Sequence, residues 1–230
     1  MPAPQEYIEW INARLGFNPR AAKNSDALSN FIIGDLCNAS PAISKRVRSE
    51  RLVPLKNASV STRVTVRNID LVFYEKDLLP DISVQVSVEN KSVMTAHVKA
   101  RKNRYGDLIA YSNHMHNHRR DCIVGATVVI NTSLPYENPD RFARGLKRPQ
   151  VNMDKVVRDT VKIFESIPLR ETPLDPNDIP EALAVIVVDY NGVDAAKLVA
   201  GDLSPSLGSH AHYDNFIKRL AEKYQDRFAP

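Results

Sequence analysis

Cysteines and long apolar segments are scarce in this sequence, and both absences narrow the classes of protein to consider. Only Cys37 and Cys122 occur among 230 residues, and their spacing matches neither a disulfide framework nor a metal-binding motif. No apolar run approaches the roughly 20 residues that cross a bilayer. The first residues lack the basic and apolar regions of a secretory signal. We therefore expect two buried thiols in a cytoplasmic protein that makes no membrane contact.

Several common catalytic motifs are also missing, namely a P-loop, a dinucleotide-binding fingerprint and a nucleophile elbow. Hydrophobic residues make up 43% and charged residues 25% of the chain, a composition typical of a folded domain. The net charge of +4 permits nucleic-acid binding without establishing it. The positive charges gather in three segments: 45–51, 97–104 and 141–148.

Apolar periodicity predicts a single α/β domain over residues 1–230, with an N-terminal helical part (1–56) and an α/β core (57–230). Helices are expected over 5–15, 25–36, 92–105, 108–115, 154–164 and 213–224, with a basic, partly helical stretch that ends at Pro54. Strands are expected from Val60 to Phe73 with a bulge near Asn68, and over 82–91, 122–130 and 183–188. The segments 133–150 and 168–180 read as loops. This order predicts a mixed central β-sheet flanked by helices.

A charged pair stands out on the strand expected over 82–91. Glu89 is the only acidic residue two positions before a lysine, and this spacing places Glu89 and Lys91 on the same face of a strand. The other face is a row of valines, so the charged face belongs to a strand whose back is buried. Phosphodiester hydrolysis with a divalent metal needs two acids and a lysine that converge in this way.

Two residues compete to be the second acid. Asp81 lies eight residues before Glu89 on one extended strand, which separates them by roughly 26 Å and excludes a shared ion. A hairpin folded about Leu79-Pro80 instead sets Asp70 directly across from Glu89, where Cβ atoms lie ~5 Å apart. The hairpin geometry therefore selects Asp70.

With these residues the sequence resembles the PD-(D/E)XK, or restriction endonuclease-like, nuclease superfamily. The resemblance rests on Asn68-Ile69-Asp70-Leu71-Val72, Val86-Ser87-Val88-Glu89-Asn90-Lys91 and the basic segment that follows, and it covers residues 60–120. It implies a restriction endonuclease-like fold in which Asp70 and Glu89 bind Mg²⁺, which Mn²⁺ can replace, and Lys91 positions the attacking water. It also implies an additional acid from the first core helix, for which Asp35 is the best match. Ile69 stands where the family's name has proline.

The expected helix after Lys91 carries His97, Arg101 and Arg104 at i, i+4 and i+7, a stripe that we expect to contact DNA phosphates. The function expected is a Mg²⁺-dependent endonuclease of restriction or defence type that acts on double-stranded DNA. Because one site cuts one strand, we expect a homodimer.

Three alternatives stay open at this stage. The first is a nuclease of the same fold in repair or nucleic-acid processing. The second is a non-catalytic DNA-binding module. The third is a surface hairpin whose charges form a weak ion pair. A zinc site at His114, His116 and His118 is disfavoured, because alternate residues of a helix lie ~200° apart and cannot share one metal.

Overall fold

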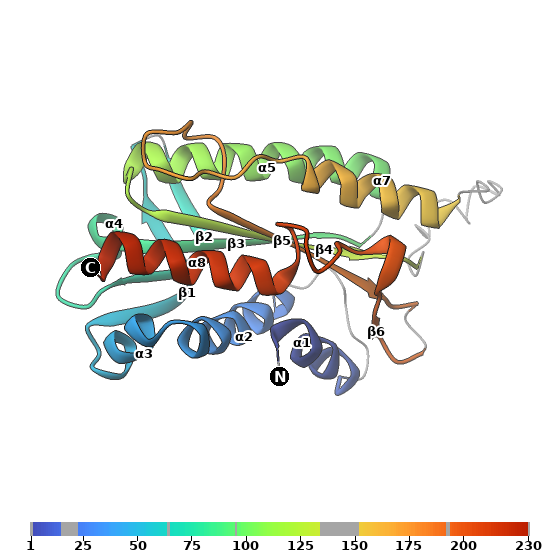
Figure 1. Ribbon diagram of the computed structural model, residues 1–230, viewed down its shortest axis with the longest axis horizontal. Helices are drawn as coiled ribbons and strands as arrows, with labels where there is room; N and C mark the ends of the chain where they lie inside the picture. Colours follow the sequence, from blue (N-terminus) through green and yellow to red (C-terminus); the bar gives the residue numbers. More distant parts are fainter. Residues whose placement is uncertain are drawn as a thin grey trace.

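A six-stranded mixed sheet forms the centre of the computed structural model, which describes residues 2–14, 23–63, 65–94, 96–133, 152–191 and 194–229 (Figure 1). The strands follow one another across the sheet in chain order. Neighbours are antiparallel from β1 to β3, parallel from β3 to β5, and antiparallel again at β6. The strands are β1 (Leu52–Ser61), β2 (Val66–Glu75), β3 (Val84–Val93), β4 (Ile123–Asn131), β5 (Ala182–Asp189) and β6 (Lys197–Leu198).

Helices cover both faces of this sheet (Figure 1). One face carries α5 (His97–His118) and α7 (Met153–Glu165). The other carries α1 (Ala3–Asn12), α2 (Lys23–Ala39), α3 (Pro41–Arg48) and α8 (Tyr213–Phe228). Two short pieces, α4 (Pro80–Ser83) and a 3-10 turn (Gly201–Leu203), lie in connections. The predicted α/β class with a mixed sheet between helices is confirmed. No helix in the described ranges has the length and apolarity to span a membrane.

The hydrophobic core is divided by the sheet into two layers. On one face of the sheet, residues of α1, α2 and α8 pack against Val86 and Val88. On the other face, residues of α5 and α7 pack against Val93 and against the side chains of β4 and β5 that point to that face. The C-terminal half of α5 also covers β1 and β2 through Tyr111 and Met115. Every residue of β4 is buried, which confirms the buried strand predicted over 122–130.

The start of the sheet differs from the prediction. Leu52, and not residue 57, opens the sheet, and Pro54 lies inside β1, an edge strand that tolerates a missing N–H. The segment predicted as one bulged strand is the end of β1 and the start of β2, joined by a turn in which Thr62 N–H donates to Thr65 O. Two strands therefore produce the change of phase that the sequence suggested was a bulge.

The connection from β3 to α5 also differs from the prediction. β3 continues to Val93, and a single helix begins at His97 and runs through Gly106 without interruption. Ala96 precedes it with φ 50° and ψ 45°, a left-handed conformation that is uncommon for a residue other than glycine. The turn sends α5 back across the sheet, over the face that carries Glu89. The two helices predicted over 92–105 and 108–115 are therefore one.

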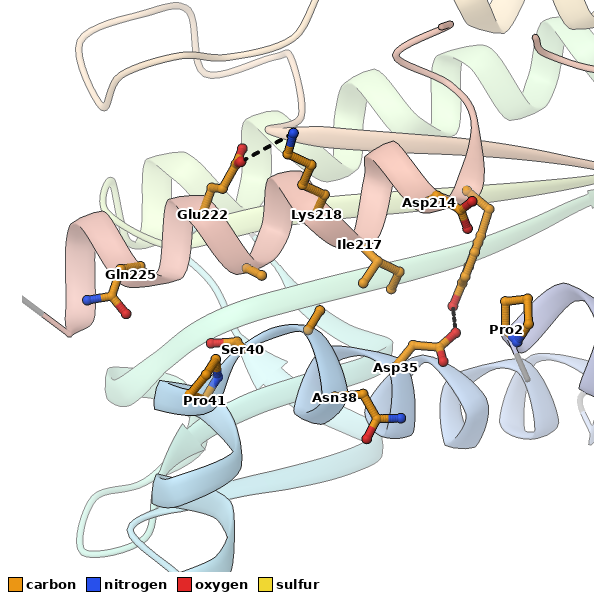
Figure 2. Close-up of a pocket in the computed structure, with 13 residues that line it drawn as sticks. Pro2, Asp35, Asn38, Ser40, Pro41, Asp214, Ile217, Lys218, Glu222 and Gln225 are labelled. Atoms are coloured by element: carbon orange, nitrogen blue, oxygen red, sulfur yellow. Dashed lines mark hydrogen bonds and ion pairs between the residues drawn. The ribbon is translucent and has the colours of Figure 1, made fainter. Parts of the chain in front are cut away.

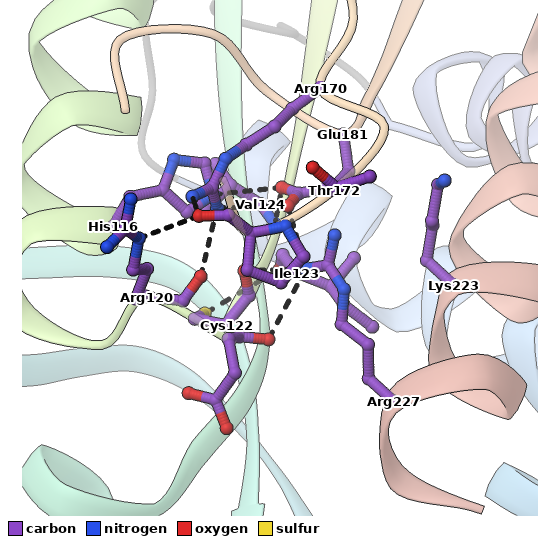
Figure 3. Close-up of polar contacts among 12 residues, drawn as sticks. His116, Arg120, Cys122, Ile123, Val124, Arg170, Thr172, Glu181, Lys223 and Arg227 are labelled. Carbon is purple, nitrogen blue, oxygen red and sulfur yellow. Dashed lines mark hydrogen bonds and ion pairs between the residues drawn. The ribbon is translucent and has the colours of Figure 1, made fainter. Parts of the chain in front are cut away.

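A buried ion cluster fixes the loop before β5 to the rest of the fold (Figure 3). Glu181 Oε1 accepts from Arg227 Nη1 at 2.7 Å and from Arg170 Nη1 at 3.3 Å, and Oε2 accepts from His116 Nε2 at 2.9 Å. His116 Nδ1 lies 2.9 Å from Asn177 O. The His116 ring therefore bridges the Glu181 carboxylate and the Asn177 carbonyl. Sequence patterns do not predict this cluster because its members come from distant segments.

Candidate active site between strands β2 and β3

Glu89 and Lys91 lie on the face of β3 that α5 covers, as their spacing predicted. The Lys91 ammonium pairs with Glu89 Oε1, and both side chains are largely buried, with Glu89 6% exposed and the Lys91 side chain 21% exposed. Val86 and Val88 point to the opposite face and join the core under α2 and α8. The predicted division of this part of β3 into a charged and a valine face is confirmed, although helices cover both faces.

Asp70 stands where the hairpin geometry placed it. The last ladder pair between β2 and β3 is Leu71 with Val88, so the next position along each strand brings Asp70 opposite Glu89. The ladder stops there because Asp70 Oδ2 accepts from the backbone N–H of Asn90 at 2.7 Å. A carboxylate thus replaces a strand carbonyl, which holds Asp70 beside the Glu89-Asn90-Lys91 segment.

Asn90 anchors the same segment from the other side of the sheet. Its side-chain amide donates to Ser29 Oγ at 2.9 Å and Ser25 Oγ at 3.2 Å of α2, and its carbonyl oxygen accepts from Thr127 Oγ1 at 2.7 Å. Both the nitrogen and the oxygen of the Asn90 side-chain amide are therefore hydrogen-bonded within the fold. The residue between Glu89 and Lys91 is therefore a positioning residue that sets the strand on which the two charges stand.

The surroundings of the Glu89 carboxylate disfavour its charged form. Burial raises its pKa most, and the nearby charge of Asp70 raises it further, whereas Lys91 and Arg67 act in the opposite direction without cancelling the rise. Glu89 Oε2 is buried and forms no hydrogen bond within the described part of the chain. A buried, unpaired carboxylate oxygen beside a second carboxylate is costly unless a cation completes it.

The donor set suits one kind of metal ion. Mg²⁺ takes hard oxygen ligands, usually one or two carboxylates, and receives the rest from water and substrate phosphate. Asp70 and Glu89 are two such carboxylates, and Glu89 Oε2 has no partner among the described residues. Within the described ranges, no group of three or more His, Cys, Asp or Glu side chains is placed to hold a metal ion. Two carboxylates are the number of protein ligands that Mg²⁺ commonly takes, and the Mg²⁺ site itself stays a prediction.

Two residues that sequence reasoning missed complete the surroundings. The Tyr111 ring on α5 is fully buried, and burial, with the charge of Glu89, raises the pKa of its hydroxyl, which therefore stays protonated. Arg67 of β2 reaches over this ring, with its guanidinium carbon 6.0 Å from the ring centroid. Alternation along β2 could have placed Arg67 on the face of Ile69, but only the fold brings α5 to it.

Asp35 does not join this cluster. Its Oδ2 accepts from the Ala3 backbone N–H at 2.7 Å and from the Tyr213 hydroxyl at 2.9 Å, and it lies in a groove between α2 and α8 (Figure 2). The sheet separates this groove from the face that carries Glu89. The prediction of Asp35 as an additional active-site acid is therefore corrected: the residue ties α1 and α8 to α2. Ser25 and Ser29 are α2 side chains that hydrogen-bond to Asn90 of β3.

The predicted phosphate stripe on α5 is broken into three different environments. His97 is buried with Nε2 2.6 Å from Asn131 O, and burial lowers its pKa, so it is a neutral packing residue and the predicted phosphate contact is corrected. Arg104 pairs with Asp107 at 2.7 Å. Arg101 forms no ion pair with the described residues, and its Nε is buried without a partner among them. The segment 141–148 lies outside those residues.

The three histidines near the end of α5 also face different partners. His116 belongs to the Glu181 cluster, His118 contacts the Asp81 carbonyl, and the pKa of His114 is lowered by partial burial and by Arg67. Asp81 itself accepts from the Ser61 N–H at 2.9 Å and takes no part in the Glu89 cluster.

Comparison of the chain with protein-family models, curated proteins and solved structures gives no match.

Proposed function

We propose that the protein is a Mg²⁺-dependent nuclease whose active site is formed by Asp70, Glu89 and Lys91. The observation that carries the proposal is the buried, unpartnered Oε2 atom of Glu89, which lies beside a second carboxylate and shares its strand face with a lysine. A solvated surface hairpin would leave such charges hydrated. Here the fold pays a desolvation cost that a metal-binding function accounts for.

Each side chain has a distinct task in this proposal. Asp70, held by the Asn90 N–H, and Glu89 would hold the ion, which supplies a Lewis acid for phosphoryl oxygen and lowers the pKa of water. Lys91 keeps its ammonium against Glu89 until substrate arrives, and then orients the attacking water toward phosphorus. The Tyr111 hydroxyl stays protonated, because burial and the charge of Glu89 raise its pKa.

The wider proposal adds the restriction endonuclease-like fold, PD-(D/E)XK membership, double-stranded DNA as substrate, a homodimer and a cytoplasmic location. Support for the fold is the mixed sheet in which the Asp70–Glu89 hairpin is followed by α5 and the parallel strand β4. Support for a reduced compartment is that Cys37 and Cys122 are both free. DNA as substrate and restriction as the role rest on the resemblance of residues 60–120.

Incubation with supercoiled plasmid tests the proposal directly. We expect nicked or linear products in Mg²⁺ or Mn²⁺, and none in EDTA. Asp70→Asn and Glu89→Gln should each abolish cutting, and Lys91→Ala should reduce it by about 10²–10⁴-fold. Discrete bands would favour restriction, and cutting confined to branched or single-stranded substrates would favour repair or processing. DNA binding without cutting in every metal would support the non-catalytic module and contradict the proposal.

Matched controls keep the result specific. Asp81→Asn removes the acid of the Pro80-Asp81 pair, and Lys76→Ala removes a lysine that pairs with Glu50 at the surface. Neither residue touches the proposed site, so both variants should cut as the native protein does. Equal loss in Asp70→Asn and Asp81→Asn would place the chemistry elsewhere.

A further inference from the structure

Arg67 is a cation on the wall of the proposed site that the nuclease chemistry described above does not use. It projects from β2 on the same face as Ile69 and extends over the ring of Tyr111, 6.0 Å from its centroid. It forms no hydrogen bond or ion pair with the residues that the structure describes. Other arginines of the fold, such as Arg46, Arg170 and Arg219, are each paired with a carboxylate.

The surroundings of Arg67 contain polar atoms that lack partners. Glu89 Oε2 and His114 Nδ1 are both buried and form no hydrogen bond within the described ranges. The fully buried Tyr111 hydroxyl lies beside Ser87 and is close enough to Glu89 for the carboxylate charge to raise its pKa. The charge of Arg67 is close enough to act on both Glu89 and His114, since it lowers the pKa of each. Arg67 therefore lies near Tyr111, His114 and Glu89.

We propose that Arg67, with His114 and Tyr111, forms a phosphate-binding subsite next to the Asp70–Glu89 pair, which holds a phosphodiester group of the nucleic-acid backbone. The proposal rests on the nuclease function and names the contact by which that site takes its substrate. Arg67 is a substrate-binding residue: it contacts the phosphodiester but takes no part in bond making or proton transfer.

The chemistry of the ligand follows from charge and shape. A phosphodiester that approaches two carboxylates is repelled, and an unpaired guanidinium at the entrance offsets this repulsion. A planar guanidinium offers two parallel N–H donors that match two phosphoryl oxygens, and the Tyr111 ring beneath it restricts its orientation. A lysine would keep the charge and lose the paired donors. Phosphate contacts of this type position the backbone and do not read bases.

Binding measured without cleavage tests the subsite apart from the chemistry. The probe is a fluorescein-labelled 20-base-pair duplex of mixed sequence in EDTA, with anisotropy recorded over a series of salt concentrations. For Arg67→Gln we expect affinity to fall about tenfold at low salt, and the slope of log K against log salt to fall by about one. Arg67→Lys should keep the slope and lose part of the affinity. Arg63→Gln, an exposed arginine in the preceding turn, is the matched control and should change affinity less than about twofold.

A second measurement places the contact at Arg67 itself. Titration of the protein with inorganic phosphate, followed by NMR, should shift the Arg67 Nε–H and the His114 ring signals together. Unchanged signals at both residues, or equal losses in Arg67→Gln and Arg63→Gln, would overturn the subsite. Melting temperatures of all variants exclude unfolding as the cause.

The two proposals fail in different ways. Mg²⁺-dependent cutting with normal binding by Arg67→Gln leaves the nuclease and rejects the subsite. Arg67-dependent binding without cutting in any metal leaves a phosphate site and rejects the nuclease.

Discussion

Lys91 contacts only one oxygen of the Glu89 carboxylate, and the other oxygen is buried without a partner among the described residues. One carboxylate oxygen of Glu89 is thus occupied by the lysine, and the other is available to a further cation or donor. The two residues should therefore respond differently to mutation. Removal of the lysine should leave the buried carboxylate without its ion-pair partner, whereas neutralisation of the carboxylate should remove a buried charge.

Glu89→Gln should stabilise the protein while it abolishes activity. Burial raises the pKa of Glu89, so its contribution to stability is fully present below the ordinary value of 4.5 and is lost as pH rises through the folded value. At neutral pH the native protein therefore bears a penalty that glutamine lacks. We expect the melting temperature of Glu89→Gln at pH 7 to exceed the native value by roughly 2–4 °C, or about 1 kcal/mol.

The pH dependence checks the cause of this gain. The difference between native protein and Glu89→Gln should be small at pH 4 and should grow as pH rises, as followed by thermal melts from pH 4 to pH 8. The surface variant Glu50→Gln is the control and should show no such growth. A Glu89→Gln protein that is less stable at pH 7 would mean that the Lys91 pair outweighs burial.

Divalent metal should stabilise the native protein by mass action. An ion that binds only the folded state adds about 2.7 kcal/mol at a concentration 100-fold above its Kd. We expect the melting temperature to rise with Mg²⁺ or Mn²⁺, and the rise to disappear in Asp70→Asn and Glu89→Gln. Isothermal titration calorimetry should give one site per chain. A full thermal shift in Asp70→Asn would place the ion elsewhere.

Lys91→Ala should separate metal binding from catalysis. The lysine contacts a carboxylate but supplies no metal ligand, so its removal frees Glu89 Oε1 and leaves both acids in place. We expect cutting to fall by about 10²–10⁴-fold while the Mg²⁺-dependent rise in melting temperature persists. Loss of both in Lys91→Ala, with the control Lys76→Ala unaffected, would assign the lysine to the metal site instead.

The parts of this site that the sequence predicted are the local ones. A period of two and a short turn fix which residues of one hairpin face each other, so Asp70, Glu89 and Lys91 followed from spacing. Arg67 and Tyr111 could not be found in this way, because nothing in the spacing says that the middle of α5 crosses β2.

The errors have the same origin. His97 has the spacing of a basic helical stripe, but the left-handed turn at Ala96 buries its ring against Asn131. Asp35 lies on the helix from which the resemblance implies an acid, yet α1 and α8 occupy its carboxylate. In both cases a tertiary contact, which periodicity does not encode, decided where a polar side chain went.

Two glycines should respond to alanine in opposite directions. Gly106 is exposed in the middle of α5 with open space around its Cα, so Gly106→Ala should stabilise by about 1 kcal/mol through helix propensity. A methyl group at Gly125 would lie 3.1 Å from Phe216 and 3.3 Å from Leu220 of α8, so Gly125→Ala should cost about 1–3 kcal/mol. Urea unfolding of the two variants measures both effects. Stabilisation by Gly125→Ala would show that α8 is free to move away from β4.

Glu181 should be the most sensitive buried charge of the fold. Its carboxylate accepts from His116, Arg170 and Arg227, whose side chains are largely buried, so its removal leaves the two guanidinium charges without this partner (Figure 3). We expect Glu181→Gln to cost about 3–5 kcal/mol in urea unfolding at pH 7. Glu171→Gln is the matched control: Glu171 also pairs with two cations but is exposed, and its loss should cost less than about 1 kcal/mol.

The same residue sets a limit on acid stability. Burial alone would raise the pKa of Glu181, but the hydrogen bond and charge of His116, with Arg227 and the Val124 N–H, outweigh burial and lower it. Stability from this carboxylate is therefore fully present above the ordinary pKa of 4.5 and is lost as pH falls through the lower folded value. Unfolding free energies at pH 7, 5, 4 and 3 should fall more steeply for the native protein than for Glu181→Gln. Parallel plots of unfolding free energy against pH for the two proteins would mean that the pKa of Glu181 keeps its ordinary value. The cluster would then add no net electrostatic stability.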